Sequence, residues 1–318
     1  MKVLILGGAG FLGSNLVRRC LSEKACQVTV LDSLDPLVHS TTRHLKEVWS
    51  NIRFVRGDIR NETLLAEIVQ DKDIIFNCAA QTSHALSTQF PLLDADINCL
   101  GSLKLLEAVR LLNKDAVVVY TSSSTVIGKA LSETADEDHP ERPLEIYSAN
   151  KGVAEKYYRI YHSHYDLKTV VLRFANLFGP FGKGYSEFGF INYFIHLSWT
   201  NQPIRIFGKG DQTRNVMYVD DATDVLWRAA HEPCLAGDAY LATGNQHLTV
   251  REVAETIVRV LQRGTVNCIE WPDDRRRIEI GPVNLSSAKL RSLIHWEPRH
   301  DLMSGLVKTK AVLETNGL

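Results

Sequence analysis

The sequence predicts an α/β fold with a doubly wound parallel sheet, followed by a smaller mixed C-terminal substrate domain. In the first half of the 318 residues, short apolar runs alternate with helical patterns. Strands that are apolar on both faces and separated by helices are typical of a parallel sheet covered on both sides. After Asn176 this alternation gives way to a loop-like stretch rich in glycine and aromatic residues. We expect this second half to fold over the carboxyl edge of the sheet and to supply the substrate pocket.

The individual elements follow from the hydrophobic periodicity. Helices are expected between the strands, over 13–22, 61–70, 94–112 and 147–165. The strands are expected at 3–6, 27–31, 52–56, 73–77, 116–121 and 169–173. Beyond them, a helix is expected at 191–199, and another begins at Thr249, where Thr249 and Glu252 have the spacing of a capping box.

Composition excludes several classes of protein. Hydrophobic residues make up 45% and charged residues 23%, and the net charge is -1, which are ordinary values for a globular chain. The longest block of like charge is Arg275–Arg277, so neither a nucleic-acid partner nor a membrane is expected. The six cysteines form no CxxC pair, which favours reduced thiols and a cytoplasmic location. No metal site is expected, because His162 and His164 lie two residues apart and would point to different faces of a helix.

A glycine pattern follows the first strand directly. Gly7, Gly10 and Gly13 stand where the strand would turn into a helix, with Phe11 and Leu12 between the last two. The first two glycines allow a tight turn close to a pyrophosphate, and the third allows close packing of helix and strand. The helix N-terminus would offer free N–H groups to the phosphates. A plain strand-to-helix turn is the alternative explanation.

Acidic residues at the ends of the next two strands support dinucleotide binding. Asp32 lies about 20 residues beyond the glycines, where a carboxylate binds the adenosine ribose. Its neighbours Ser33 and Leu34 include no arginine for a 2′-phosphate, which favours NAD over NADP. Asp58 ends the third strand and has two open interpretations, a contact with the adenine amino group or a solvated turn.

Tyr147 and Lys151 are four residues apart, so both side chains leave the same face of a helix. A tyrosine acts as a base near pH 7 only if its pKa falls by about three from the ordinary value near 10. A lysine ammonium and an oxidised nicotinamide supply charge of the right sign. The alternative is an aromatic packing residue beside a solvated lysine.

A hydroxyl-rich strand end precedes this pair by about 25 residues. The strand 116–120 leads into Thr121–Gly128, where a serine could hold a sugar hydroxyl against the tyrosine. Hydroxyl side chains at a strand end also satisfy turn groups, which is the structural alternative.

Taken together, these motifs resemble the extended short-chain dehydrogenase/reductases, the NAD-dependent nucleotide-sugar epimerase and dehydratase family. The matching segments are GGAGFLG from Gly7, GDI from Gly57, CAA from Cys78, SSSTVIG from Ser122, YSANK from Tyr147 and RFANLFGP from Arg173. The resemblance continues through GKGDQTRNVMYVDD from Gly208 and ends at LIHWEP, so it covers essentially the whole chain.

The resemblance implies a role for each matching residue. The catalytic set would be Ser123, Tyr147 and Lys151. The NAD site would be lined by Gly7, Gly10, Phe11, Leu12, Gly13, Asp32, Asp58, Ile59, Ala79, Ala80, Asn98, Tyr147, Lys151 and Phe174. The nucleotide-diphosphate sugar would contact Ser124, Thr125, Asn176, Arg214 and an arginine of the late basic run, Arg275 or Arg276. A bidentate guanidinium suits a diphosphate, although a solvated basic turn also explains this run.

The resemblance also suggests a reaction. The family's 4,6-dehydratases and its decarboxylase carry a glutamate where this chain has Thr125, with Asp or Ser where it has Ser124. Without that carboxylate, the arrangement looks more like the 4-epimerases. In that reaction Tyr147 takes the proton of the C4 hydroxyl while NAD takes the C4 hydride and later returns it to the other face. The alternatives are a 2-epimerase, a 4-keto-sugar reductase, a dehydratase or a regulator that binds NAD without catalysis.

The expected organisation has two parts and a two-fold assembly. Residues 1–176, with a returning segment at about 214–243, would bind NAD, and 177–213 with 244–318 would bind the nucleotide sugar. The helices at 94–112 and 147–165 carry more apolar positions than one sheet-facing stripe requires. In the resembling family these helices pair with their copies, which implies a homodimer.

Overall fold

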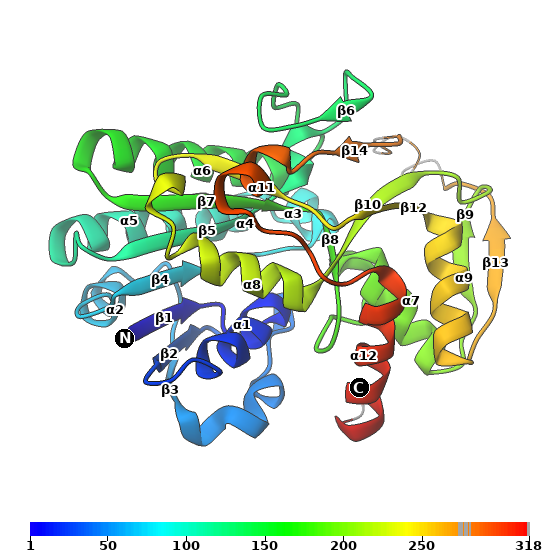
Figure 1. Ribbon diagram of the computed structural model, residues 1–318, viewed down its shortest axis with the longest axis horizontal. Helices are drawn as coiled ribbons and strands as arrows, with labels where there is room; N and C mark the ends of the chain where they lie inside the picture. The colour runs from blue at the N-terminus through cyan, green and yellow to red at the C-terminus, as the bar shows by residue number, and fades with distance from the viewer. Residues whose placement is uncertain (273–275, 277–278, 280, 317–318) are drawn as a thin grey trace.

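The computed structural model describes residues 1–272, 276, 279 and 281–316. Its centre is a parallel sheet of seven strands in the order β11-β7-β5-β4-β1-β2-β3. The order turns back at β1, which confirms the doubly wound sheet that the sequence predicts (Figure 1). The strands are β1 (Lys2–Leu6), β2 (Gln27–Asp32), β3 (Ile52–Arg56), β4 (Ile74–Asn77), β5 (Val117–Ser123), β7 (Lys168–Phe174) and β11 (Ala239–Ala242).

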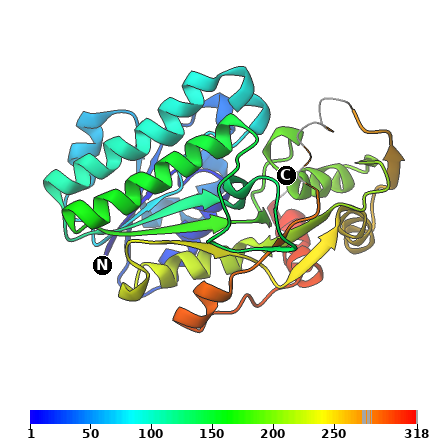
Figure 2. The same ribbon diagram turned by 90° about the horizontal axis from the view of Figure 1, so that it is seen from above.

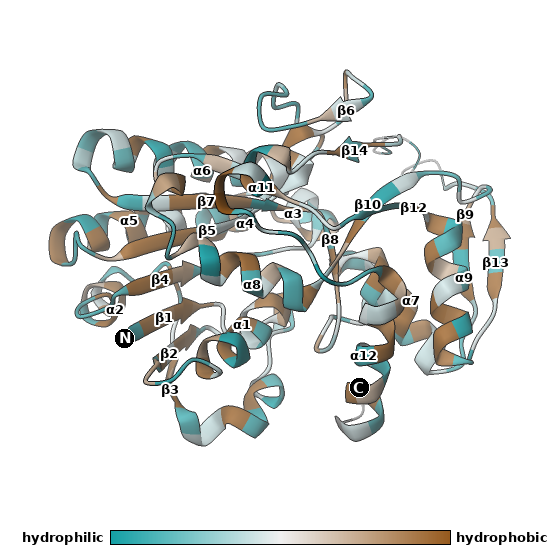
Figure 3. Ribbon diagram, viewed as in Figure 1, coloured by the Kyte–Doolittle hydropathy of each residue, from teal (hydrophilic) through white to brown (hydrophobic). Residues whose placement is uncertain are grey.

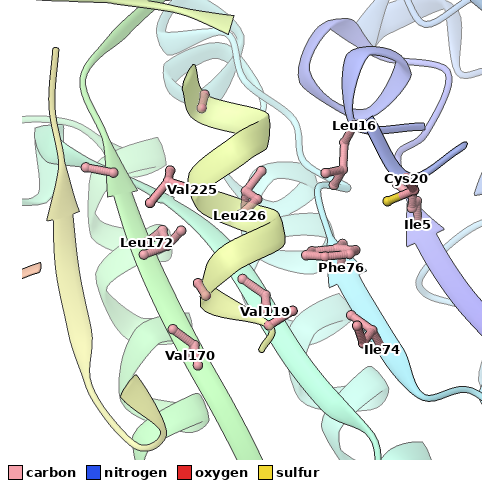
Figure 4. Packing of buried hydrophobic residues seen from close by; sticks show 14 of the residues in the cluster. Ile5, Leu16, Cys20, Ile74, Phe76, Val119, Val170, Leu172, Val225 and Leu226 are labelled. Carbon is pink, nitrogen blue, oxygen red and sulfur yellow. The ribbon is translucent and has the colours of Figure 1, made fainter. Parts of the chain in front are cut away.

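Helices cover both faces of this sheet. One face packs on α1 (Phe11–Leu21), α8 (Val219–Ala229) and α11 (Ala288–Ile294), and the other on α2 (Glu62–Ile68), α5 (Gly101–Leu112) and α6 (Ile146–Tyr165). Successive residues of β1 alternate between the two cores, with Ile5 in the first and Leu4 in the second. Figure 4 shows the first core, where Val225 and Leu226 of α8 lie over the strands. Figure 3 shows the corresponding hydrophobic colour along the central strands.

The helix expected at 94–112 is longer and less regular than predicted. It begins as α4 (Pro91–Ala95), passes through a π-helical turn at Asp96–Leu100 and continues as α5. Pro91 occupies the first turn, where its missing N–H has no helical partner to lose. A short helix, α3 (His84–Gln89), precedes it on the loop that follows β4.

Outside the large sheet, the described residues form three small sheets, mostly from the second half of the chain. β12 (Gln246–Thr249), β10 (Thr213–Tyr218) and β8 (Asn176–Phe178) form one, and β13 (Val266–Ile269) pairs with β9 (Ile204–Phe207). The third pairs β14 (Asn284–Leu285) with β6 (Thr134–Ala135). The helices α7 (Phe190–Trp199), α9 (Val250–Leu261) and α12 (Leu302–Asn316) pack around a separate core. The capping box at Thr249 and Glu252 is confirmed at the start of α9.

The chain crosses between the two halves more often than the expected boundaries imply. Within the segment 214–243, β10 joins the three-stranded sheet, whereas α8 and β11 return to the large sheet. Later, α11 also packs on the large sheet. Figures 1 and 2 show that the strands of the large sheet point toward the second half. In the described part of the chain, no helix has the length and apolar character needed to cross a membrane.

Candidate active site

A cavity of about 560 Å³ lies at the carboxyl ends of the central strands. Its walls come from the loops after β1, β2, β4 and β5, from the start of α6 and from the second half of the chain. Most of the residues expected at the cofactor and substrate sites line this one cavity. They are Gly7, Gly10, Phe11, Leu12, Gly13, Asp32, Asp58, Ile59, Ala79, Ala80, Ser123, Ser124, Thr125, Tyr147, Lys151, Phe174, Asn176 and Arg214.

The glycine loop requires the absence of side chains. Gly7 has a φ of +73°, and a Cβ there would lie 2.7 Å from the backbone of Cys78 and Ala79. A Cβ on Gly13 would lie 2.2 Å from the Gly7 carbonyl oxygen, where the helix passes the turn. Gly10 is the N-cap of α1 and has no side chain to cap the first turn. The loop therefore leaves free N–H groups facing the cavity, and its shape fits a dinucleotide pyrophosphate.

Asp32 is buried and tightly positioned at the end of β2. It accepts hydrogen bonds from the backbone N–H groups of Ala9 and Leu34, both at 2.9 Å, and from Ser40 Oγ at 2.8 Å. A carboxylate has about four acceptor positions, so one remains for a ribose hydroxyl. These contacts hold the carboxylate on the cavity wall beside the glycine loop.

Asp58 is engaged by a neighbouring guanidinium. Its Oδ1 accepts from the Arg60 backbone N–H at 2.8 Å and from Nε at 2.9 Å, and its Oδ2 accepts from Nη2 at 2.8 Å. Although partial burial opposes the effect, these hydrogen bonds hold the pKa of Asp58 below its usual range. The ion pair thus uses much of the acceptor capacity that an adenine amino group would need.

The expected catalytic residues lie together at the carboxyl end of β5 and the start of α6. Lys151 is 2% exposed, donates from Nζ to the Thr121 carbonyl at 2.9 Å and lies 5.9 Å from the centre of the Tyr147 ring. Ser123 ends β5, and its Oγ accepts from the Thr125 N–H at 3.2 Å. Because Tyr147 is the second residue of α6, its phenol and the Lys151 ammonium share one helical turn.

The residues around Tyr147 do not by themselves lower its pKa, as a role as base requires. Burial raises the pKa of Tyr147 above its ordinary range, Asp94 and Glu145 add to the rise, and a hydrogen bond with Ser123 opposes it. The fall in pKa that the sequence predicts depends on the positive charge of an oxidised nicotinamide as well as on Lys151. Burial also lowers the pKa of Lys151 to about 8, although carboxylates nearby oppose that change. Burial therefore disfavours the Tyr147 phenolate and the Lys151 ammonium until a ligand brings compensating charge into the cavity.

A polar network that the sequence analysis missed adjoins the catalytic residues. His84 Nδ1 is hydrogen-bonded to Glu145 Oε1, and the His84 ring packs edge-on against Tyr147 with 5.0 Å between ring centres. Ser148 Oγ donates to Thr125 Oγ1 at 2.8 Å and lies 3.4 Å from Glu145 Oε1. His84 and Glu145 both line the cavity. Glu145 stands only two residues before Tyr147, but its partner is 61 positions away, so no local pattern reveals the pair.

Only some of the residues expected to bind the substrate phosphates line the cavity. Arg214 lines the cavity and is paired with Glu279, with 2.5 Å between Nη2 and Oε1. Its Nη1 donates to the Gly281 carbonyl at 2.8 Å. Asn176 donates from Nδ2 to the Asn215 carbonyl at 2.9 Å. Arg276 is exposed and outside the cavity lining, and Arg275 lies outside the described residues.

Among the residues expected to bind the cofactor, Asn98 alone does not line the cavity. It is buried in the π-helical turn, where its Nδ2 donates to the Gln81 carbonyl at 2.9 Å. Its Oδ1 is buried and has no hydrogen-bond partner among the described residues. Asn98 therefore holds the loop after β4 in place from beneath the cavity.

The sheet, the glycine loop and the Ser–Tyr–Lys arrangement define an enzyme of the extended short-chain dehydrogenase/reductase class. The chain belongs to the NAD dependent epimerase/dehydratase family, whose model matches residues 3–242. The expected family and NAD as cofactor are thereby confirmed.

Individual relatives catalyse different reactions. UDP-glucose 4-epimerase of Mycolicibacterium smegmatis is 31% identical over 315 residues, which cover 97% of both chains. dTDP-glucose 4,6-dehydratase of Streptomyces niveus is 30% identical over 319 residues, covering 97% of this chain and 91% of that protein. The crystal structure of a UDP-glucose 4-epimerase with UDP-glucose from Thermotoga maritima has a TM-score of 0.87 at 26% identity, with 99% of each chain covered. Membership of the family therefore leaves the reaction to be decided from the site.

Proposed function

We propose that this protein is a nucleotide-sugar 4-epimerase. The observation that carries the proposal is the pairing of Ser123, Tyr147 and Lys151 in one cavity with hydroxyls, not carboxylates, at Ser124 and Thr125. A 4-epimerase needs a single group to take and return a proton at one hydroxyl. The relatives named as UDP-glucose 4-epimerases support the same assignment.

Each catalytic residue has a separate task in this proposal. NAD, when bound, accepts the C4 hydride and returns it. Tyr147 takes the C4 hydroxyl proton and gives it back. Lys151 stabilises the phenolate by its charge, and Ser123 holds the sugar oxygen against the phenol. Because the protein raises the pKa of Tyr147, this step depends on the positive charge that the oxidised cofactor brings.

The two parts of the chain would divide the binding work. We propose that 1–176 with 214–243 holds the cofactor and that 177–213 with 244–318 holds the nucleotide sugar. Arg214 is placed to bind the substrate diphosphate with Asn176 close by, and Glu279 would then give up its ion pair. Binding energy would reside in the nucleotide and phosphates, which leaves the 4-keto sugar free to turn.

A second candidate is a reaction that also moves a proton at carbon, as in a dehydratase. The observation that favours it is the His84 and Glu145 pair on the cavity wall beside Tyr147. A carboxylate bonded to an imidazole is a competent acid–base group. This pair supplies the acid–base function that Ser124 and Thr125 cannot.

One experiment separates the two reactions. Purified protein with NAD is incubated in D₂O with UDP-glucose, UDP-galactose, UDP-N-acetylglucosamine and dTDP-glucose, and the products are analysed by NMR and mass spectrometry. A 4-epimerase gives the C4 epimer without deuterium, because the hydride returns to the same carbon. Deuterium in the product, or loss of water, identifies the second candidate. Net oxidation of NADH in a separate incubation with a nucleotide-linked 4-keto sugar would instead identify a ketosugar reductase.

We also propose a homodimer formed by α5 and α6, which lie side by side (Figure 2). Leu106 of α5 and Tyr158 of α6 are buried inside the monomer and cannot form such a contact. The exposed apolar residues include Leu100 at the end of the π-helical turn and Val153 and Ile160 of α6, which are 44%, 38% and 46% exposed. Leu111 and Leu112 at the end of α5 and Ile146 and Tyr165 at the two ends of α6 are exposed as well. Val153 and Ile160 are seven residues apart and share one helical face. Such a stripe suits an isologous contact with a second copy.

A further inference from the structure

A segment of the second half lies across the cofactor half of the cavity. We call residues 180–188 the strap. At its start, Asn15 Nδ2 of α1 donates to the Pro180 carbonyl at 3.0 Å, and the Arg18 guanidinium lies 4.2 Å from the centre of the Phe181 ring. Near its end, the Tyr185 ring lies 4.3 Å from the ring of His39, which follows β2. The strap is therefore held at both ends by elements of the large sheet.

Lys183 is the charged residue that the strap brings into the cavity. Its Nζ lies 3.4 Å from Thr82 Oγ1 and 4.1 Å from the centre of the Phe188 ring. In the described part of the chain, no carboxylate forms an ion pair with it. Burial lowers the pKa of Lys183 to about 8, and Asp32 is the charged group that opposes this change. A partly buried ammonium whose contacts in the described residues are one long hydroxyl contact and the face of the Phe188 ring gains stability from an anion beside it.

The sheet order shows where that anion would lie. Thr82 follows β4, and Asp32 ends β2, while β1 runs between these two strands and leads into the glycine loop. Lys183 contacts Thr82 and lines the same cavity as Asp32 and the loop that begins at Gly7, which places the expected anion between this ammonium and that loop. Arg214, in contrast, is on β10 of the three-stranded sheet.

We propose that Lys183 is a ligand of the dinucleotide diphosphate, supplied by the substrate half to close the cofactor site. The glycine loop then contacts the diphosphate from the sheet side and Lys183 from the strap side. NAD release requires the strap to lift, which suits an enzyme that regenerates its cofactor in each turnover. The assignment rests on NAD binding and not on which sugar reaction follows.

The test measures binding, not turnover. Wild type, Lys183→Met, Lys183→Arg and the exposed control Lys24→Met are stripped of cofactor and titrated with NAD by calorimetry. A charge-assisted hydrogen bond to phosphate corresponds to roughly a 10- to 100-fold change in affinity. Lys183→Met should weaken NAD binding by that factor and reduce its salt dependence, whereas Lys183→Arg and Lys24→Met should stay within about threefold of wild type.

A second titration distinguishes the two diphosphates that enter the cavity. UDP is added to NAD-saturated wild type and Lys183→Met, and its affinity should be unchanged. The proposal is overturned if Lys183→Met binds NAD as wild type does, if Lys183→Arg loses as much NAD affinity as Lys183→Met, or if only UDP binding weakens. Thermal unfolding of the cofactor-free variants accompanies both titrations. Because Lys183→Met removes a desolvated charge, its cofactor-free form should unfold at no lower temperature than wild type.

Discussion

Replacing the buried lysine of the catalytic set should stabilise the cofactor-free protein while abolishing its activity. Lys151 is 2% exposed, and burial lowers its pKa from the ordinary 10.5 to about 8. At about 1.4 kcal/mol for each pH unit, holding this ammonium in the folded protein costs roughly 3 kcal/mol at pH 7. Methionine keeps the length of the side chain and loses the charge. It also loses the hydrogen bond to the Thr121 carbonyl, which contributes about 1 kcal/mol.

Lys151→Met should therefore raise the free energy of unfolding at pH 7 by about 2 kcal/mol. Between pH 8 and 10.5 the unfolded wild-type chain still binds a proton that the folded protein has released, so wild type gains stability as the pH rises. The advantage of the variant should disappear at about pH 9.5, where wild type has gained about 2 kcal/mol. Urea denaturation of NAD-free wild type, Lys151→Met and Lys24→Met at pH 7, 8.5 and 10 measures this difference. A variant less stable than wild type at pH 7, or a gain that does not change with pH, would refute the reasoning.

Three further predictions concern catalysis, cofactor choice and assembly. Tyr147→Phe should keep NAD bound and lower turnover by at least about 100-fold, since general acid–base groups typically contribute 10² to 10⁴; turnover within about tenfold of wild type would exclude Tyr147 as the base. Asp32→Ala combined with Ser33→Arg should shift the ratio of NAD to NADP affinities toward NADP, and wild type that already binds both equally would contradict the ribose assignment. Val153→Glu with Ile160→Glu should give a particle near the monomer mass of 35.7 kDa by light scattering, where wild type gives twice that mass; a monomeric wild type would exclude the interface.

The parts of the site that the sequence predicts are those formed by neighbouring residues. Gly7, Gly10 and Gly13 act within one strand-turn-helix unit, and Tyr147 and Lys151 act within one helical turn, so spacing alone indicates their geometry. Six of the seven strands of the central sheet are predictable because a short apolar run marks each of them. The seventh, β11 (Ala239–Ala242), was not among the expected strands. The π-helical turn at Asp96–Leu100 is not, since nothing in its composition distinguishes it from the α-helix on either side.

Contacts between segments that are far apart in the sequence could not be predicted from it. Lys183 meets Thr82 across 101 positions, and Arg214 meets Glu279 across 65. No periodicity records such pairings, because each depends on how two loops pack. Asn150 illustrates the same point. Its Nδ2 donates to the buried Asp94 carboxylate at 2.7 Å, and the two residues are 56 positions apart.

Four groups that line the cavity, Tyr147, Lys151, Lys183 and Arg214, are not stabilised in their charged or free forms before ligands bind. The Tyr147 phenolate is disfavoured by burial and by Asp94, the Lys151 and Lys183 ammonium groups are disfavoured by desolvation, and Arg214 is occupied by Glu279. Each of these states is relieved by a group that cofactor or substrate brings, a diphosphate for a cation or a positive ring for the phenolate. A phenolate on Tyr147 also stabilises the ammonium on Lys151, so the two ionise together. Part of the free energy of ligand binding therefore stabilises the Tyr147 phenolate and the Lys151 ammonium, which are the protonation states that the reaction needs. The same coupling explains why removing one cation should make the empty protein more stable and the enzyme inactive.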